Sequence, residues 1–279
     1  MNSHANDKEK YKNWPTIDPF QQSTQWLNDG LEVGINSAER DKSKIRKGIT
    51  RKIIIFIYQS TSIFLSLVLR KKAKSRSKNP YQRPWLPIWP GLKAEPFHDN
   101  KPEWTKILER NYPEIKKELF NLIKKSESFD RAIYDGFKGK PWTTKYFYLF
   151  GKEVRETHLI CPVTSNILKK IPHNLMHICF SCIPGNGALP PHVGPTNTSL
   201  VCHLGLDNCE KTAIFSGSEI RIYEEGKTLI LDDSFIHGVK NTDDKSRYTL
   251  MISFWHPELS KSEKLILNLL YKPLSLITK

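Results

Sequence analysis

The pattern of apolar and polar positions divides the chain into three regions. Residues 1–52 are mostly charged or polar and are predicted to be weakly ordered. An uncharged, largely apolar run then fills 53–69, and a basic flank extends this region to residue 78. From residue 79 a Pro-rich, aromatic stretch introduces a body rich in Trp, Tyr, Phe, Ile and Leu. We therefore expect an N-terminal region (1–52), an apolar region (53–78) and one folded domain (79–279).

The first part of this domain, residues 97–170, is predicted to be mainly helical, because its apolar residues recur at spacings of three and four. The expected elements are helices within 102–125, interrupted near Tyr112-Pro113, a strand over 142–150, and a helix over 161–170 with Thr164 or Ser165 as its N-cap.

Residues 175–256 consist instead of short runs separated by turn residues, which is typical of an all-β sandwich or barrel. The predicted fold class is therefore mainly β with N-terminal helices (α+β), built on a jelly-roll core. The predicted strands are 175–183, 199–206, 212–216, 219–224, 227–232, 235–240 and 247–255.

The alternation within S-L-V-C-H-L-G-L assigns each side chain of that strand to one face of the sheet. Leu200, Cys202, Leu204 and Leu206 share one face, which has the composition of a core. His203 lies on the other face, so it is a candidate for a site rather than for the core.

The strands 235–240 and 247–255 are separated only by a polar turn, which predicts that they form a hairpin. If Val239 pairs with Arg247, His237 and Arg247 project from the same face as diagonal neighbours. A histidine there can bind a metal ion, and the arginine can bind an anion.

Charge and cysteine content narrow the possible partners and compartments. The net charge is +14 and the pI is near 9.5, but no nucleic-acid-binding signature is present, and no nucleic acid partner is expected. The start of the chain does not resemble a secretory signal, and its five cysteines are an odd number, so we expect a cytoplasmic or membrane-associated protein that is not secreted. Basic residues gather in two blocks on either side of the apolar run: Arg40, Lys42, Lys44, Arg46, Lys47, Arg51 and Lys52, then Arg70, Lys71, Lys72, Lys74, Arg76 and Lys78.

The apolar run 53–69 has three interpretations. Its length is at the short end for a transmembrane helix, and Gln59 and several hydroxyl residues dilute it. Its basic flanks suit a helix lying at an anionic membrane surface. A helix packed on the folded domain fits the same length. Membrane association through 53–78 is thus one expectation, and all three alternatives stay open.

Five stretches in succession match one known family. They read PGLKAEPFHD, CPVTSNILKKIP, FSCIPGNGALPPHVGPTNTSLVCHLGL, EEGKTLILDDSFIHGVKNT and RYTLMISFWHPEL. Through them the region from about Trp89 to Leu259 resembles the aspartyl/asparaginyl β-hydroxylase family, a branch of the Fe(II)- and 2-oxoglutarate-dependent dioxygenases. The resemblance implies a double-stranded β-helix fold, with Fe(II) as the metal and 2-oxoglutarate and O2 as co-substrates.

The resemblance also implies roles for particular residues. His192 and His237 correspond to the two metal ligands, and Gly194 occupies the position where most such oxygenases carry a third, carboxylate ligand. Asp233 corresponds to a carboxylate that supports the metal site. The implied 2-oxoglutarate contacts are Arg247, His203 and Ser181. Val201 departs from the family, because many members carry an arginine there that also contacts the co-substrate.

Two classes of function follow. As an enzyme, the protein would hydroxylate an unactivated C–H bond, either Cβ of an Asp or Asn residue in a peptide or protein, or a fatty-acyl chain of a membrane lipid. As a non-enzyme, it would be a jelly-roll binding module that has lost turnover, with Val201 as the sign of decay. His192, His237 and Arg247 are all retained, which favours the enzyme.

Overall fold

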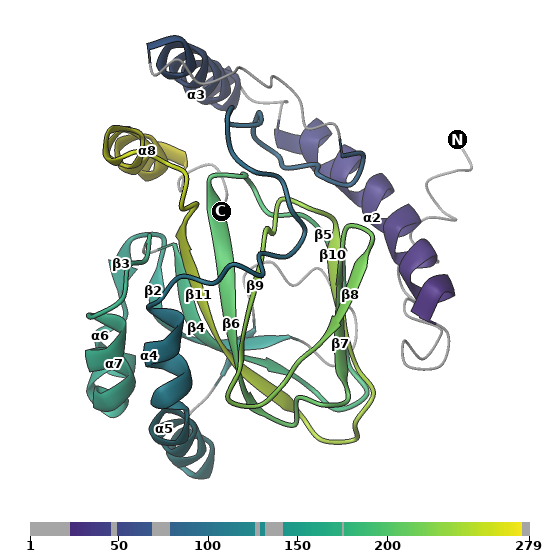
Figure 1. The fold of residues 1–279 in the computed structure, drawn as a ribbon, viewed down its shortest axis with the longest axis vertical. Helices are drawn as coiled ribbons and strands as arrows, with labels where there is room; N and C mark the ends of the chain where they lie inside the picture. Colours follow the sequence, from purple (N-terminus) through teal and green to yellow (C-terminus); the bar gives the residue numbers. More distant parts are fainter. Residues whose placement is uncertain are drawn as a thin grey trace.

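Two antiparallel sheets packed face to face form the centre of the protein, with helices on both outer sides (Figure 1). A computed structural model describes residues 23–45, 49–68, 79–125, 129–131, 142–174 and 176–274. The larger sheet has the order β1-β2-β4-β11-β6-β9, with β3 paired to β2. Its strands are β1 (Asp130–Arg131), β2 (Thr143–Leu149), β3 (Lys152–Glu153), β4 (His177–Ile183), β6 (Ser199–Asp207), β9 (Thr228–Leu231) and β11 (Arg247–Trp255).

The smaller sheet has the order β5-β10-β7-β8 and completes the double-stranded β-helix. Its strands are β5 (Ala188–His192), β7 (Thr212–Ser216), β8 (Glu219–Ile222) and β10 (His237–Asn241). The predicted α+β class with a jelly-roll core is confirmed. Every strand predicted in 175–256 is present within a few residues of its expected bounds, whereas β5 was not predicted.

Four helices cover the outer face of the larger sheet: α4 (Thr105–Arg110), α5 (Tyr112–Lys124), α6 (Arg155–Ile160) and α7 (Pro162–Leu168). The interruption predicted near Tyr112-Pro113 is the boundary between α4 and α5. Burial of apolar side chains between these helices and the sheet provides most of the driving force for this packing. The core here includes Leu200, Cys202, Leu204 and Leu206, as their predicted shared face requires.

The predicted N-cap of α7 is wrong. The residue before the helix is Cys161, and neither Thr164 nor Ser165 caps it. The carboxylate of Glu118, on α5, instead accepts hydrogen bonds from the backbone N–H groups of Val163 and Thr164, each at 2.8 Å. An anion at the first turn of a helix satisfies its free N–H groups and interacts favourably with the helix dipole. Glu118, which is distant in sequence, therefore caps α7 instead of a residue next to the helix.

Helix α2 (Ser23–Ile45) packs on the smaller sheet. It lies in the region 1–52, for which the sequence predicted weak order and no helix. Trp26 is buried edge-on against Phe215, with ring centroids 5.2 Å apart. Further along, a Cβ added at Gly34 would lie 2.0 Å from the Ile236 side chain, so only glycine permits this close approach. Too few aliphatic residues mark this helix for the sequence pattern to reveal it.

Helices α3 (Ile49–Val68) and α8 (Lys261–Leu274) pack together beside the sheets, near the top of Figure 1. Tyr58 of α3 and Leu267 of α8 are fully buried in this contact, so one side of α3 packs on the domain. Within the part of the chain that the structure describes, no helix combines the length and the apolar character that a membrane span requires.

The predicted hairpin between 235–240 and 247–255 is wrong. Strand β10 pairs with β5 and β7 in the smaller sheet, whereas β11 lies between β4 and β6 in the larger one. Val239 faces Leu189 and Ile214, and Arg247 faces Ile183. The segment 242–246 therefore carries the chain from one sheet to the other. This crossing brings His237 and Arg247 to facing sheets instead of neighbouring strands.

Candidate functional site

The two histidines of the predicted metal site face each other across a strand pair. His192 ends β5, His237 begins β10, and the two are directly opposite in the antiparallel register. Their ring centroids are 4.1 Å apart. The structure thus brings together two residues that are 45 positions apart in sequence.

Both rings are oriented by their own backbone. The Nδ1–H group of His192 donates to the carbonyl oxygen of Pro190 at 2.7 Å, and that of His237 donates to the carbonyl oxygen of Phe235 at 2.8 Å. Because a carbonyl can only accept, each proton is on Nδ1, and each Nε2 keeps a lone pair for a metal ion. Burial lowers the pKa of both imidazoles, and for His237 the nearby His192 lowers it further. Both side chains are therefore neutral at neutral pH, as metal ligation requires.

The carboxyl group of Asp233 lies where a side chain at residue 194 would project. A Cβ added at Gly194 would be 2.4 Å from the carboxyl carbon of Asp233, and the Gly194 N–H donates to the Asp233 carbonyl oxygen at 2.6 Å. Burial, followed by the charge of Asp232, raises the pKa of Asp233 well above its usual value. Its enclosed Oδ1 atom has no hydrogen-bond partner among the described residues. A carboxyl group thus accompanies the histidines, and it comes from Asp233 instead of residue 194.

The Pro-rich segment 79–99 holds both histidine-bearing loops. Its backbone bonds to Pro195 and to Ser234, which lie just after His192 and just before His237. The side-chain amide of Asn197 bonds to both the N–H and the carbonyl of Trp89. The two loops are therefore tied to one another through a third piece of chain.

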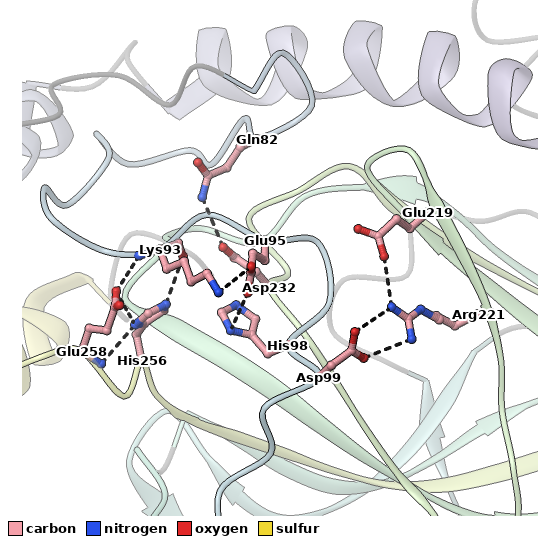
Figure 2. A network of polar contacts seen from close by, with 10 residues as sticks. All are labelled: Gln82, Lys93, Glu95, His98, Asp99, Glu219, Arg221, Asp232, His256 and Glu258. Carbon is pink, nitrogen blue, oxygen red and sulfur yellow. Dashed lines mark hydrogen bonds and ion pairs between the residues drawn. The ribbon is translucent and has the colours of Figure 1, made fainter.

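The same segment makes polar contacts with several parts of the barrel (Figure 2). Gln82 donates to the buried carboxylate of Asp232 at 3.2 Å, next to Asp233. Farther along, Lys93 bonds through its backbone to Glu258, and Asp99 pairs with Arg221 of β8. These contacts, together with the buried side chains of Leu86, Trp89 and Phe97, fix the segment over the site.

Arg247 is an enclosed cation. Its side chain is 1% exposed, and one guanidinium N–H donates to Thr249 at 2.8 Å. The guanidinium carbon lies 4.6 Å from the ring centroid of Tyr223. Its Nε–H has no hydrogen-bond partner, and no carboxylate of the described residues forms an ion pair with it. A buried charge without a counter-charge is costly, so this arrangement suits an anionic ligand that supplies one.

The other two predicted co-substrate contacts lie on the same inner face of the larger sheet. Ser181 is opposite Thr249, and His203 is opposite Met251, so both share the face of Arg247. Burial, and then the charge of Arg247, lowers the pKa of His203 to about 3. His203 in turn contributes to the lowered pKa of His237. This ring is thus electrostatically coupled to both the cation and the metal pair.

Two residues of this region were missed by sequence reasoning. The Tyr223 hydroxyl shares a 2.9 Å hydrogen bond with Nδ1 of His203, and its ring is stacked on the imidazole at an interplanar angle of 4°. The indole N–H of Trp142 donates to Ser181 at 2.9 Å. Both are buried. Tyr223 follows the end of β8, where neither alternation nor a motif singles it out.

Within the described residues, no group of three or more His, Cys, Asp or Glu side chains is arranged to hold a metal ion. The site instead offers two oriented imidazoles, an enclosed carboxyl group and, on the facing sheet, an unpaired cation. Val201 lies on this inner face too, packed against Leu231.

The fold and the site together define a class of protein: a double-stranded β-helix that carries a histidine pair and an enclosed cation on its inner faces. The profile described as aspartyl/asparaginyl beta-hydroxylase matches residues 109–257, more than half of the chain. The protein belongs to the aspartyl/asparaginyl β-hydroxylase family.

The individual relatives share about 30% of their residues with this chain. Aspartate beta-hydroxylase domain-containing protein 2 of Homo sapiens is 27% identical over 221 residues, which is 74% of this chain and 59% of that protein. An ornithine lipid ester-linked acyl 2-hydroxylase of Rhizobium tropici is 32% identical over 163 residues, 55% of this chain and 58% of that protein. The chain thus matches less than two thirds of the length of either relative. A prolyl hydroxylase structure from Trichoplax adhaerens, in complex with a peptide, has a TM-score of 0.37 and 10% identity over 60% of this chain and 97% of that one.

Proposed function

We propose that the protein is an Fe(II)- and 2-oxoglutarate-dependent dioxygenase that hydroxylates an unactivated C–H bond. His192 and His237 would hold the metal through Nε2, and Asp233 would accept a hydrogen bond from a water molecule or ligand on it. When bound, the metal supplies the redox chemistry that activates O2. The overall reaction converts C–H, O2 and 2-oxoglutarate to C–OH, succinate and CO2.

The buried, unpaired guanidinium of Arg247 is the observation that carries this proposal. It lies on the inner face of the larger sheet with Ser181 and His203, facing the sheet that bears the histidine pair. A dicarboxylate has one carboxylate for the cation and leaves the other for the metal end. Arginine binds a carboxylate through two parallel hydrogen bonds, which suits one end of such a ligand.

Tyr223 offers a reason why the site tolerates Val201. Its ring lies against the Arg247 guanidinium, and its hydroxyl bonds to His203. If the phenol donates to Nδ1, the Nε2–H of His203 is left to donate to the co-substrate. We infer that this neutral pair fixes the orientation of both groups without the second cation that many family members carry at position 201.

The first candidate substrate is an Asp or Asn residue in a peptide or protein, hydroxylated at Cβ. The support is the family itself, whose description names these residues. The second candidate is a fatty-acyl chain of a membrane lipid. It is supported by the similarity to an acyl 2-hydroxylase and by helix α3, whose Tyr58 hydroxyl bonds to Thr196 at 3.0 Å, four residues after His192.

The test is anaerobic addition of Fe(II) and 2-oxoglutarate to the full chain, followed by O2 and assay of succinate. We expect a weak metal-to-ligand absorption band that needs both additions, and succinate formation on exposure to O2. Absence of band and succinate at millimolar 2-oxoglutarate would favour the decayed binding module. Asp- and Asn-containing peptides and acyl lipids are then compared for stimulation of succinate release, with mass spectrometry to locate the added oxygen.

A further inference from the structure

Helix α3 packs one side on the protein, through Ile55 and Tyr58, and has a second apolar side that faces outward. The buried side carries the hydroxyls of Tyr58, 0% exposed, and Ser62, 3% exposed. The opposite side follows the spacing of one helix face. It carries Ile53 at 53% exposure, Phe56 at 70%, Ile57 at 44%, Ile63 at 52% and Phe64 at 64%. A helix packed on a soluble core usually has a polar outer side, so an apolar outer side of this extent suits an apolar partner.

The exposed apolar side chains of the described residues are concentrated at this place. Ten large hydrophobic residues are exposed in total, and seven of them lie on α3 or α8. The two on α8 are Leu265 and Leu269, each 64% exposed and one helical turn apart. Helices α3 and α8 pack on the same buried cluster through Tyr58 and Leu267, and the exposed apolar side chains of the two helices are together called here the α3–α8 surface. Single exposed hydrophobics are ordinary, but a cluster of seven is not.

Charge identifies the partner. Lys52 of α3 and Lys261 of α8 are exposed on the same helices. In the sequence, one block of basic residues lies at 40–52 and another at 70–78, next to either end of α3. Apolar side chains flanked by lysine and arginine are the composition of helices that lie in the headgroup region of an anionic bilayer. An apolar protein partner or a second copy of the chain gives no reason for this excess of positive charge.

We propose that the α3–α8 surface binds an anionic lipid bilayer and lies in its interface without crossing it. The exposed rings and aliphatic side chains enter the boundary between headgroups and acyl chains, and the exposed Lys52 and Lys261 bind lipid phosphates. Both helices are bonded to the metal-site loop: Tyr58 to Thr196, and Glu263 to the indole N–H of Trp89, which itself bonds to Asn197. The bilayer therefore holds the loop after His192 at a fixed position relative to the lipid.

This surface would deliver a membrane substrate to the proposed active site, but its binding does not depend on turnover. The experiment is sedimentation of the full-length protein with vesicles of phosphatidylcholine alone or with phosphatidylglycerol added. The test variant is Phe56→Ser/Phe64→Ser, which removes two exposed rings from α3. The matched control is Leu159→Ser/Ile222→Ser, which removes two exposed residues, at 79% and 48%, from elements outside the surface.

We expect the wild type and the control to bind anionic vesicles equally. Phe56→Ser/Phe64→Ser should bind at least about tenfold more weakly, since two aromatic side chains no longer enter the acyl region. Neutral vesicles or 0.5 M salt should also weaken wild-type binding. A second pair, Leu265→Ser/Leu269→Ser, should show the same direction of change. All variants should keep wild-type melting temperatures and lipid-free succinate formation.

Three results would overturn the proposal. One is a wild-type protein that stays in the supernatant with anionic vesicles, and another is equal binding by wild type and both surface variants. The third is a lipid-free dimer on size-exclusion chromatography that Phe56→Ser/Phe64→Ser dissociates, which would assign the surface to a second copy. Vesicle binding in a protein without turnover would leave this proposal standing and refute the dioxygenase instead.

Discussion

The proposed metal end of the barrel interior (His192, His237 and Asp233) and the proposed anion end (Arg247, His203 and Ser181) hold their polar groups by different means. At the metal end, each histidine is oriented by a carbonyl two residues before it, at Pro190 and Phe235. At the anion end, Arg247 is positioned by strand register and by Tyr223, which is 24 residues away in sequence. Local contacts thus set the first group, and long-range pairing sets the second.

The two ends also differ in charge. Burial keeps His192 and His237 neutral, whereas Arg247 carries a charge that no described carboxylate balances. Two neutral imidazoles can bind a metal cation, and a buried guanidinium without a counter-charge favours an anionic ligand. We therefore expect changes at the metal end to abolish turnover, and changes at the anion end to weaken co-substrate binding while leaving the metal in place.

The strongest test of this difference is His192→Ala. Residues that only support a metal ligand are typically worth about 10- to 100-fold in affinity or activity, so removal of one of two ligands should exceed that range. We expect succinate formation to fall by more than about 100-fold and Fe(II) binding to be lost. His173→Gln, which alters a partly buried histidine in ring contact with Tyr148, is the control. Retained succinate formation in His192→Ala would refute the ligand assignment.

Arg247→Met should separate the two ends. Loss of a charge-assisted, bidentate contact is worth about 2–3 kcal/mol, so the KM for 2-oxoglutarate should rise roughly 30- to 150-fold. Metal binding, measured without co-substrate, should stay intact. Arg221→Met is the matched control, since this arginine also makes two hydrogen bonds to a carboxylate, that of Asp99, but on the surface. An unchanged KM in Arg247→Met would place the anion site elsewhere.

The sequence predicts more of the anion end than of the metal end, because alternation alone assigns His203 to the inner face of its sheet. The strands themselves were predictable for the same reason. Their pairing was not: adjacent strands joined by a turn usually form a hairpin, but residues 242–246 cross between sheets. Strand β5 was hidden by Pro190 and Pro191, which are unusual within strands and are accepted here on the edge of the smaller sheet.

The details of the metal end were available only by resemblance. Nothing in the sequence pattern pairs His192 with His237, since four strands, β6 to β9, lie between their strands in the chain. The capping of α7 by Glu118 and the stacking of Tyr223 on His203 were unpredictable for the same reason, because each contact joins residues far apart in the chain. Periodicity predicts which face a residue occupies but does not predict what lies opposite that face.

Gly194→Ala tests how the metal end accommodates its carboxyl group. The new Cβ would displace the Asp233 carboxyl, so turnover should fall by about 10- to 100-fold, the usual effect of losing a group that supports a metal site. Asp233→Ala should have a similar effect. The double variant is the decisive measurement: if Gly194→Ala acts through Asp233, it should lower turnover no further than Asp233→Ala alone. Additive losses would show that Gly194 acts by another route.

Asp232→Asn tests, through the free energy of unfolding, the protonation state of the carboxyl group next to Asp233. Burial raises the pKa of Asp232 to about 7, so the native state retains a proton that the unfolded chain releases above pH 4. The unfolding free energy therefore falls as pH rises from about 4 to 7 and is level above 7. The net ionisation penalty that corresponds to this pKa is at most about 4 kcal/mol, with the hydrogen bonds from Gln82 and Ser234 already included.

We expect Asp232→Asn to be no more stable than wild type at pH 4.5, and about 1–2 kcal/mol more stable at pH 7.5. Urea denaturation at both pH values measures this difference. Asp99→Asn, which alters an exposed carboxylate, should show no such pH-dependent gain. A constant difference between Asp232→Asn and wild type across this range would show that Asp232 is ionised in the native protein.

Tyr223→Phe should give the smallest change and the clearest view of how the anion end is oriented. The phenylalanine ring still packs against Arg247, but the hydrogen bond to His203 is lost, which is worth about 0.5–1.5 kcal/mol. The KM for 2-oxoglutarate should rise roughly 2- to 12-fold, with kcat and metal binding unchanged. Tyr248→Phe, one residue from Arg247 on the face toward the helices, should leave KM unchanged. A fall in kcat at constant KM in Tyr223→Phe would mean that the hydroxyl serves the metal end instead.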